Sequence, residues 1–96
     1  MPFRNGGSRA FTAVSIRNNV PAAPGVYGLS NARSWIYVGS SDNLQLQLLN
    51  HLREANSPIQ SQNPTGFTFE LCDTSGTAGR RAQLISELRP TVGMRI

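Results

Sequence analysis

Two short apolar stretches, Gly25-Val26-Tyr27-Gly28-Leu29 and Trp35-Ile36-Tyr37-Val38, carry the strongest structural pattern in this chain. Both contain β-branched and aromatic residues, which favour strands. The polar residues Ser30-Asn31-Ala32-Arg33 lie between them and are typical of a turn. The two stretches are therefore predicted to pair as an antiparallel hairpin.

The residues that follow this hairpin predict three further elements. Ser40-Ser41-Asp42 offers side chains that cap a helix, and residues 43–54 contain no helix breaker, so a helix is expected there. Residues 67–71 alternate between apolar and polar side chains, as in a half-buried third strand. A last helix is expected over residues 78–88, with Pro90 ending it. The predicted order is strand, strand, helix, strand, helix.

The length and composition predict one small folded domain. The chain has 96 residues, of which 39% are hydrophobic and 15% charged, and such a composition is typical of globular proteins. Residues 1–20 are expected to be a flexible or partly structured segment, and residues 21–96 the domain. No apolar run approaches the roughly 20 residues that span a bilayer, and the N-terminus has no signal-like apolar core. A soluble cytoplasmic protein without a membrane partner is therefore expected.

All nine basic residues are arginines, and the net charge is +4. Arginine binds phosphate through a planar, two-pronged group, so this bias is compatible with a nucleic-acid partner, most simply DNA. The same bias also follows from genome composition. The charge by itself does not separate these two explanations.

The hairpin and the helix after it carry a resemblance to a known family. Their motifs, in this order and spacing, are similar to the two hallmarks of the GIY-YIG nuclease superfamily, and the similarity extends from Pro21 to Pro90. The resemblance implies a small α/β domain of the α+β type, in which helices flank a three-stranded antiparallel sheet. The residues that carry it are Pro24-Gly25-Val26-Tyr27, Tyr37-Val38-Gly39, Ser40-Ser41-Asp42-Asn43-Leu44, Leu48, His51-Leu52, Leu84-Ile85 and Glu87-Leu88-Arg89-Pro90.

The resemblance also implies a catalytic pocket. In that family two motif tyrosines, an arginine in the first helix and a glutamate in the closing helix surround one divalent metal ion. Tyr27 matches the tyrosine that activates water, and Tyr37 matches the second tyrosine of the pocket. Gly25 and Gly39 match the motif glycines, where a missing side chain lets the backbone approach closely. Without the family, ordinary cross-strand packing would be the simpler explanation for both tyrosines.

Two positions depart from that pattern. Gln47, eight residues after Gly39, stands where the family has its catalytic arginine, and it precedes His51 by four residues. Arg81 stands three residues before Leu84, where the family has its metal-binding glutamate. A third departure is Gly93, where many relatives carry an asparagine. No residue is therefore assigned as a metal ligand, and Mg²⁺ or Mn²⁺ is expected only if the protein is active.

Helical spacing indicates which side chains of the first helix face the sheet. Leu44, Leu48 and Leu52 form one stripe, and Gln47 and His51 lie along its edge. Leu46 lies nearly opposite. Its side chain is expected either to be bare on the surface or to mark a contact with another protein, such as a second copy of the chain.

In the last helix, Ala78, Ala82, Ile85 and Leu88 are predicted to form the inward arc, with Arg81 inside it. An inward guanidinium requires a partner or a path to solvent, and a phosphate is one candidate partner. Glu70 on the third strand is an alternative source of the missing carboxylate.

Three functional hypotheses follow from the resemblance and its departures. The favoured one is a catalytically degenerate domain that retains nucleic-acid binding through arginines. The second is an active, metal-dependent DNA endonuclease with non-standard catalytic groups, and the third is a protein-interaction module that uses Leu46. The pocket positions are Tyr27, Tyr37, Gln47, His51 and Arg81, and the expected nucleic-acid contacts are Arg33, Arg53, Arg80, Arg81 and Arg89.

Overall fold

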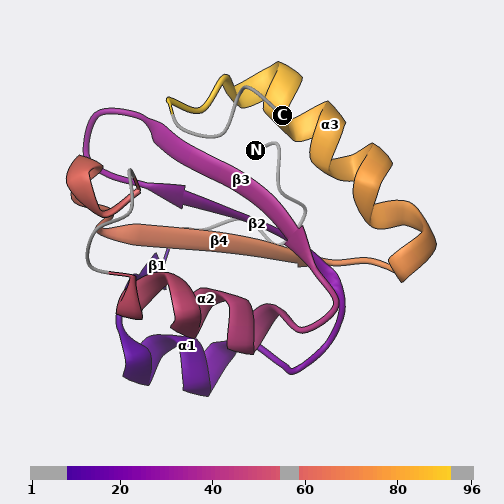
Figure 1. Ribbon diagram of the computed structural model, residues 1–96, viewed down its shortest axis with the longest axis horizontal. Coiled ribbons are helices and arrows are strands. Elements are labelled where there is room, and N and C mark those ends of the chain that lie inside the picture. The colour runs from indigo at the N-terminus through magenta and orange to yellow at the C-terminus, as the bar shows by residue number, and fades with distance from the viewer. Residues whose placement is uncertain (1–8, 55–58, 92–96) are drawn as a thin grey trace.

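The computed structural model describes residues 9–54 and 59–91 (Figure 1). Residues 1–8, 55–58 and 92–96, which include Gly93, lie outside the described residues, and so do the predictions made for them. No described helix has the length and apolar character needed to cross a membrane. The elements in chain order are β1 (Arg9–Ala10), α1 (Ala13–Asn19), β2 (Gly25–Ser30), β3 (Trp35–Ser41), α2 (Leu44–Arg53), η1 (Gln60–Gln62), β4 (Gly66–Leu71), η2 (Thr74–Gly76) and α3 (Thr77–Leu88).

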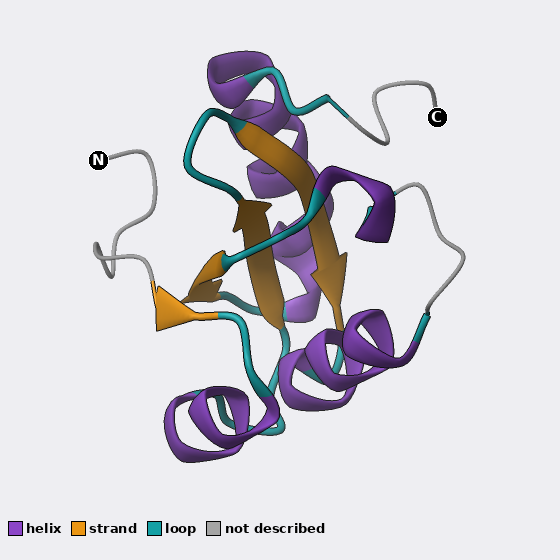
Figure 2. Ribbon diagram, turned by 90° about the vertical axis from the view of Figure 1, so that its left-hand side faces the viewer, coloured by secondary structure: helices purple, strands orange, loops and turns teal. Residues whose placement is uncertain are grey.

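The strands form one antiparallel sheet in the order β1-β4-β2-β3. The predicted hairpin and third strand are confirmed, with β2 in the middle of the three long strands. The structure adds a fourth strand, because the two residues of β1 pair with the first two residues of β4 at the edge of the sheet (Figure 2). So short a strand, with both side chains exposed, leaves no alternating pattern in the sequence.

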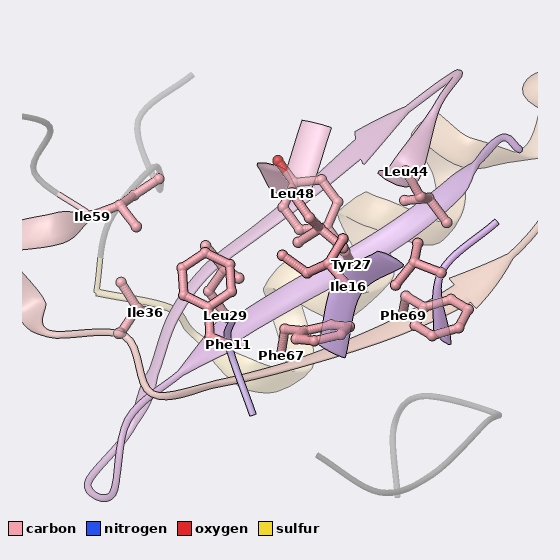
Figure 3. Packing of buried hydrophobic residues seen from close by; sticks show 11 residues of the cluster. Phe11, Ile16, Tyr27, Leu29, Ile36, Leu44, Leu48, Ile59, Phe67 and Phe69 are labelled. Atoms are coloured by element: carbon pink, nitrogen blue, oxygen red, sulfur yellow. The ribbon is translucent and has the colours of Figure 1, made fainter. Parts of the chain in front are cut away.

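Helices cover both faces of the sheet, with α1 and α2 on one face and α3 on the other (Figure 1). The larger apolar cluster lies under α1 and α2, and Figure 3 shows Tyr27 in it beside Leu48. A smaller cluster of Val26, Val38 and Leu84 lies under α3. Neighbouring residues of a strand point to opposite faces. On β2, Tyr27 therefore faces α1 and α2, and Val26 faces α3. The larger cluster consists of Phe11, Ile16, Val20, Tyr27, Leu29, Ile36, Leu44, Leu48, Ile59, Phe67 and Phe69.

Helix α1 was not predicted from the sequence. Thr12 caps it, accepting a hydrogen bond from the Ser15 amide at 3.2 Å, and Ile16 is fully buried. The helix is short and contains residues of low helix propensity, so its stability comes from packing against α2.

Helix α2 confirms the predicted leucine stripe but begins differently. Leu44 and Leu48 are buried and Leu52 is partly buried against the same cluster. The cap is Asn43, whose side chain accepts from the Leu46 amide at 3.1 Å. The predicted cap Ser40-Ser41-Asp42 was wrong, because β3 continues through residue 41 in its pairing with β2.

Strand β3 contains a bulge that changes which face its side chains occupy. Leu29 pairs with Tyr37 and Ser30 pairs with Trp35, so Ile36 is one residue extra on β3. Ile36 and Tyr37 consequently both pack with the α1/α2 cluster, whereas Trp35 packs with the α3 cluster. A bulge of this kind redirects the side chains next to it.

The face that helix α3 presents to the sheet agrees only in part with the predicted one. Leu84 is its buried residue, and Ile85 and Leu88 are partly buried beside it. Ala78 and Ala82 are exposed, so their assignment to the inward arc was wrong. The larger Leu84 side chain buries more apolar area than the alanines, and this difference rotates the helix.

Candidate active-site pocket

The Tyr27 ring occupies space that only a glycine on the neighbouring strand leaves open. Gly39 is paired with Tyr27 across β2 and β3. A Cβ atom at position 39 would lie 2.6 Å from the Tyr27 hydroxyl oxygen and 2.8 Å from Cε2 of Tyr37. Gly25 is similarly confined, because a Cβ there would lie 2.7 Å from Cδ1 of Leu44 and would meet the Glu70 carbonyl. Both motif glycines are therefore required by packing.

The Tyr27 hydroxyl contacts two side chains of α2. Its oxygen lies 2.7 Å from Nε2 of His51, and the Gln47 amide nitrogen donates to it at 3.4 Å. The His51 ring centre is 5.5 Å from those of Tyr27 and Tyr37, whose own centres are 6.0 Å apart. The structure thus brings Tyr27, Tyr37, Gln47 and His51 together; their catalytic roles stay predictions.

Burial sets the protonation of this group. Tyr27 is 0% exposed, and burial, with a smaller contribution from Tyr37, raises the pKa of its hydroxyl well above the usual value. Burial lowers the pKa of His51, and Glu54 partly opposes that effect. At neutral pH Tyr27 is therefore a phenol, and His51 is predominantly an uncharged imidazole.

These protonation states assign the direction of the central hydrogen bond. Because Gln47 already donates to the Tyr27 oxygen, the tyrosine proton is donated to Nε2 of His51. The ring proton of His51 then lies on Nδ1, which is 3.3 Å from Oε1 of Glu54 without the alignment of a hydrogen bond. Glu54 was not predicted as part of the pocket. Its position three residues after His51 was the available signal in the sequence.

Arg81 is half-buried on α3, and its positive charge acts on Tyr27 by lowering the pKa of the hydroxyl, a minor effect beside burial. A divalent cation such as magnesium requires oxygen ligands. At the position where the resemblance places such a ligand, the chain instead supplies a guanidinium. Among the described residues, no group of three or more His, Cys, Asp or Glu side chains is placed to hold a metal ion. The described residues around Tyr27 and Arg81 therefore do not fit a divalent cation.

Glu70 does not supply the missing carboxylate. It is 2% exposed and pairs with Val26 across the sheet, which directs its side chain toward α3 and away from Tyr27. Arg80 holds it there through two hydrogen bonds, from Nε at 2.8 Å and from Nη2 at 2.9 Å. The hypothesis that Glu70 joins the pocket was therefore wrong.

The ion pair with Glu70 also bears on the role predicted for Arg80. Its remaining terminal nitrogen donates to Oε1 of Gln83 at 2.7 Å, so the guanidinium binds side chains of the protein on three sides. The pairing with Glu70 raises the pKa of Arg80. Arg80 stabilises the contact between α3 and β4, and its predicted role as a phosphate contact is not supported.

Three other predicted arginines are exposed at one end of the sheet. Arg33 lies in the β2–β3 turn, Arg53 ends α2 and Arg89 follows α3. Figure 1 shows these three chain segments at the same end of the molecule. Two hydrogen bonds tie this end together, from Asn31 Nδ2 to the Gln62 carbonyl at 2.8 Å and from the Thr91 amide to the Trp35 carbonyl at 3.1 Å. We call Arg33, Arg53 and Arg89 the basic end.

Leu46 is 51% exposed on α2, as its position opposite the leucine stripe predicted. Exposure of one leucine on a small domain is ordinary. Self-association through Leu46 stays a prediction.

Comparison with solved structures finds proteins that share this architecture. The chain is similar to the N-terminal GIY-YIG endonuclease domain of UvrC from Thermotoga maritima, in a point-mutant form bound to its catalytic divalent cation. The identity is 24%, the match covers 83% of this chain and 96% of that one, and the TM-score is 0.69. A structure of the same domain bound to magnesium matches with 23% identity over 82% of this chain and 96% of that one, with a TM-score of 0.68.

Comparison of sequences agrees with this assignment over a shorter stretch. The UvrABC system protein C of Hydrogenobaculum sp. is 33% identical over 58 residues, which is 60% of this chain. The aligned region is 10% of that relative, so the chain spans about a tenth of its length. No family model matches. The resemblance is confirmed at the level of architecture: this chain has the fold of the GIY-YIG endonuclease domain.

Proposed function

We propose that this chain is a nucleic-acid-binding domain on the GIY-YIG fold, and that it lacks the metal-dependent cleavage of the nucleases that share this fold. The observation that carries the proposal is Arg81. Its half-buried guanidinium on α3 stands at the position where the resemblance implies a metal ligand. Repulsion between like charges disfavours a divalent cation there.

The state of Tyr27 supports the loss of cleavage. A tyrosine that activates water must reach the water and lose its proton readily. Tyr27 is fully buried, and its hydroxyl is already engaged with His51 and Gln47. Gln47 can hydrogen-bond a phosphate but carries no charge to stabilise the transition state, and one such electrostatic group is worth about 3 kcal/mol.

The basic end supports the binding half of the proposal. Arg33, Arg53 and Arg89 are exposed on three separate elements, and the chain carries a net charge of +4. Arginines that neutralise phosphates release counterions, so binding to nucleic acid weakens as salt rises. The endonuclease named in the solved relatives is consistent with DNA as the partner.

Binding is tested by fluorescence anisotropy of labelled single-stranded DNA at several salt concentrations. If the three arginines of the basic end each neutralise one phosphate, the slope of log K against log salt is about −2. Arg33→Gln should make this slope shallower by about 0.7, whereas Arg17→Gln on α1 is the matched control for loss of one exposed charge. Binding that is absent at low salt would contradict the proposal.

Cleavage is tested by nicking of plasmid DNA with Mg²⁺ or Mn²⁺. The unaltered chain should be inactive, and the double variant Gln47→Arg/Arg81→Glu should gain activity. Metal-dependent nicking by the unaltered chain would favour the second candidate, an active endonuclease. The observation on its side is the intact 2.7 Å contact between Tyr27 and His51. An inactive double variant would contradict the assignment of positions 47 and 81.

A further inference from the structure

A pocket lies at the β2–β3 turn, apart from the side chains that surround Tyr27. Its volume is about 310 Å³, and it is lined by the turn residues, by Trp35 and by Thr68 of β4. Arg33 of the basic end is among its lining residues. A volume of this size lies at the lower end of the range of small-ligand pockets.

Trp35 borders this pocket because of the bulge in β3. Without the bulge at Ile36, regular strand alternation would place Trp35 on the same face as Tyr37. With it, Trp35 packs on one side against the small cluster of Val26, Val38 and Leu84. The indole is half-buried and lines the pocket. Bulges commonly redirect a side chain beside a functional site.

Thr68 supplies a hydroxyl group that is available for a hydrogen bond to a ligand. The residue is 2% exposed, and its hydroxyl oxygen is buried without a hydrogen-bond partner among the residues that the structure describes. Its backbone pairs with Gly28, so the side chain lies on the α3 face with Trp35. Buried hydroxyl groups are almost always hydrogen-bonded, and an orphaned one requires an explanation.

The turn that lines the pocket is held in one conformation. The Asn31 side-chain oxygen accepts from the amides of Arg33 and Ser34, both at 2.9 Å. The Asn31 amide nitrogen donates to the Gln62 carbonyl at 2.8 Å, which ties the turn to the segment after α2. A turn fixed in advance lowers the entropy lost when a ligand binds.

The lining of the pocket matches one class of ligand. It combines an aromatic ring, a buried hydroxyl and an arginine, and it contains no acidic side chain. An unpaired nucleotide presents a planar base that stacks on an aromatic ring, polar groups on the base edge, and a phosphate that pairs with arginine. An acidic peptide would match the arginine and leave the ring and the hydroxyl unexplained.

We infer that this pocket binds one unpaired nucleotide of a single strand. In this assignment the base stacks on Trp35, the Thr68 hydroxyl makes a hydrogen bond to the base edge, and Arg33 pairs with the adjoining phosphate. The assignment rests on the proposed nucleic-acid binding and adds where the strand is held. The remaining arginines of the basic end then contact the backbone beyond this nucleotide.

The inference is tested on the full chain with two readouts in one titration. Trp35 is the single tryptophan of the chain, so its fluorescence reports on this pocket alone. We expect an end-labelled oligothymidine to raise anisotropy and to quench Trp35 with the same Kd. Thr68→Val should weaken binding about fivefold, the loss of one net hydrogen bond, while its melting temperature is unchanged or higher. Ser86→Ala, which removes an exposed hydroxyl of α3, is the control.

The outcomes separate the inference from the proposed function. No rise in anisotropy would overturn the proposed binding itself. A salt-dependent rise without quenching of Trp35, or with equal affinity for Thr68→Val and Ser86→Ala, would overturn the pocket alone. Thymidine monophosphate is titrated in parallel, and equal affinity for it and for the oligomer would overturn the strand as the source of the nucleotide. Trp35→Leu is expected to lower oligomer affinity about tenfold.

Discussion

On the α1/α2 face of the sheet, the buried hydroxyl of Tyr27 is held by two neutral side chains, whereas on the α3 face the buried carboxylate of Glu70 is held by a guanidinium. The neutral group belongs to a large apolar cluster, and the charged group lies beside a small one. A neutral hydrogen bond survives burial at low cost, but a buried charge requires its partner. The two faces should therefore respond differently to the loss of one side chain.

The largest difference is expected on the α3 face. Arg80→Ala would leave the 2%-exposed Glu70 carboxylate without its two donors, at a cost of about 3 kcal/mol in the free energy of unfolding. Urea denaturation measures this loss. Arg81→Ala is the matched control on the same helix, with an expected change below about 1 kcal/mol.

The double variant Arg80→Leu/Glu70→Leu sharpens this result. Replacing both partners with apolar side chains removes the buried charge together with its partner, so most of the lost stability should return. If the double variant were as unstable as Arg80→Ala, the pair would stabilise the fold through the packing of its side chains and not through its charges.

On the α1/α2 face, packing at Gly39 gives the next largest effect. Gly39→Ala would place a methyl group 2.6 Å from the Tyr27 hydroxyl oxygen, and overpacking of this kind costs about 2 kcal/mol. The thermal midpoint measures it. Gly79→Ala on α3, where a Cβ meets nothing within 4 Å, should instead be neutral or stabilising. Similar losses at both positions would contradict the packing explanation.

Removing the hydroxyl itself should cost less than removing Arg80. Tyr27→Phe keeps the ring in the cluster but leaves Nε2 of His51 without its donor, for a loss of about 1 kcal/mol. Chemical denaturation with and without the substitution measures it. A loss as large as that of Arg80→Ala would remove the distinction between the two faces.

The smallest effect is a dependence on pH. Because burial lowers the pKa of His51 in the folded state, the unfolded chain binds more protons there below about pH 6.5. The contribution of His51 is therefore fully present above the unfolded pKa and is lost as pH falls through the folded pKa. Glu54 opposes the shift, so Glu54→Gln should steepen the fall in stability between about pH 7 and 5.

A parallel pH series on His51→Gln is the reference, since this variant should lose that pH dependence. A Glu54→Gln profile identical to that of the unaltered chain would mean that Glu54 does not act on the ring.

Much of the fold and part of the pocket could be predicted. β-Branched and aromatic residues on either side of a polar turn identified the hairpin, and alternation identified the third strand. Helical spacing placed Leu44 and Leu48 toward the sheet, with Gln47 along the edge of that stripe. These predictions succeed because strand and helix periods are local properties of the backbone. The family resemblance added the architecture, which the solved structures match.

The failures share one physical cause, which is dependence on partners distant in sequence. Helix α1 has weak local propensity and is stabilised by α2. The inward face of α3 depends on Leu84 meeting Val26 and Val38. Glu70 and Arg80 are ten residues apart on different elements. Their spacing in the sequence does not indicate that they form an ion pair.

The sequence by itself determined the order of the main elements, the glycine at position 39, and the glutamine and arginine at positions 47 and 81, where the resemblance implies an arginine and a glutamate. Only the tertiary structure decided that Ile36 is a bulge, that Trp35 and Thr68 meet at one pocket, and that Glu70 is unavailable to Tyr27. Periodicity assigns a residue to a face as long as the pairing is regular. One extra residue in a strand reverses that assignment, and the register that reveals it exists only between paired strands.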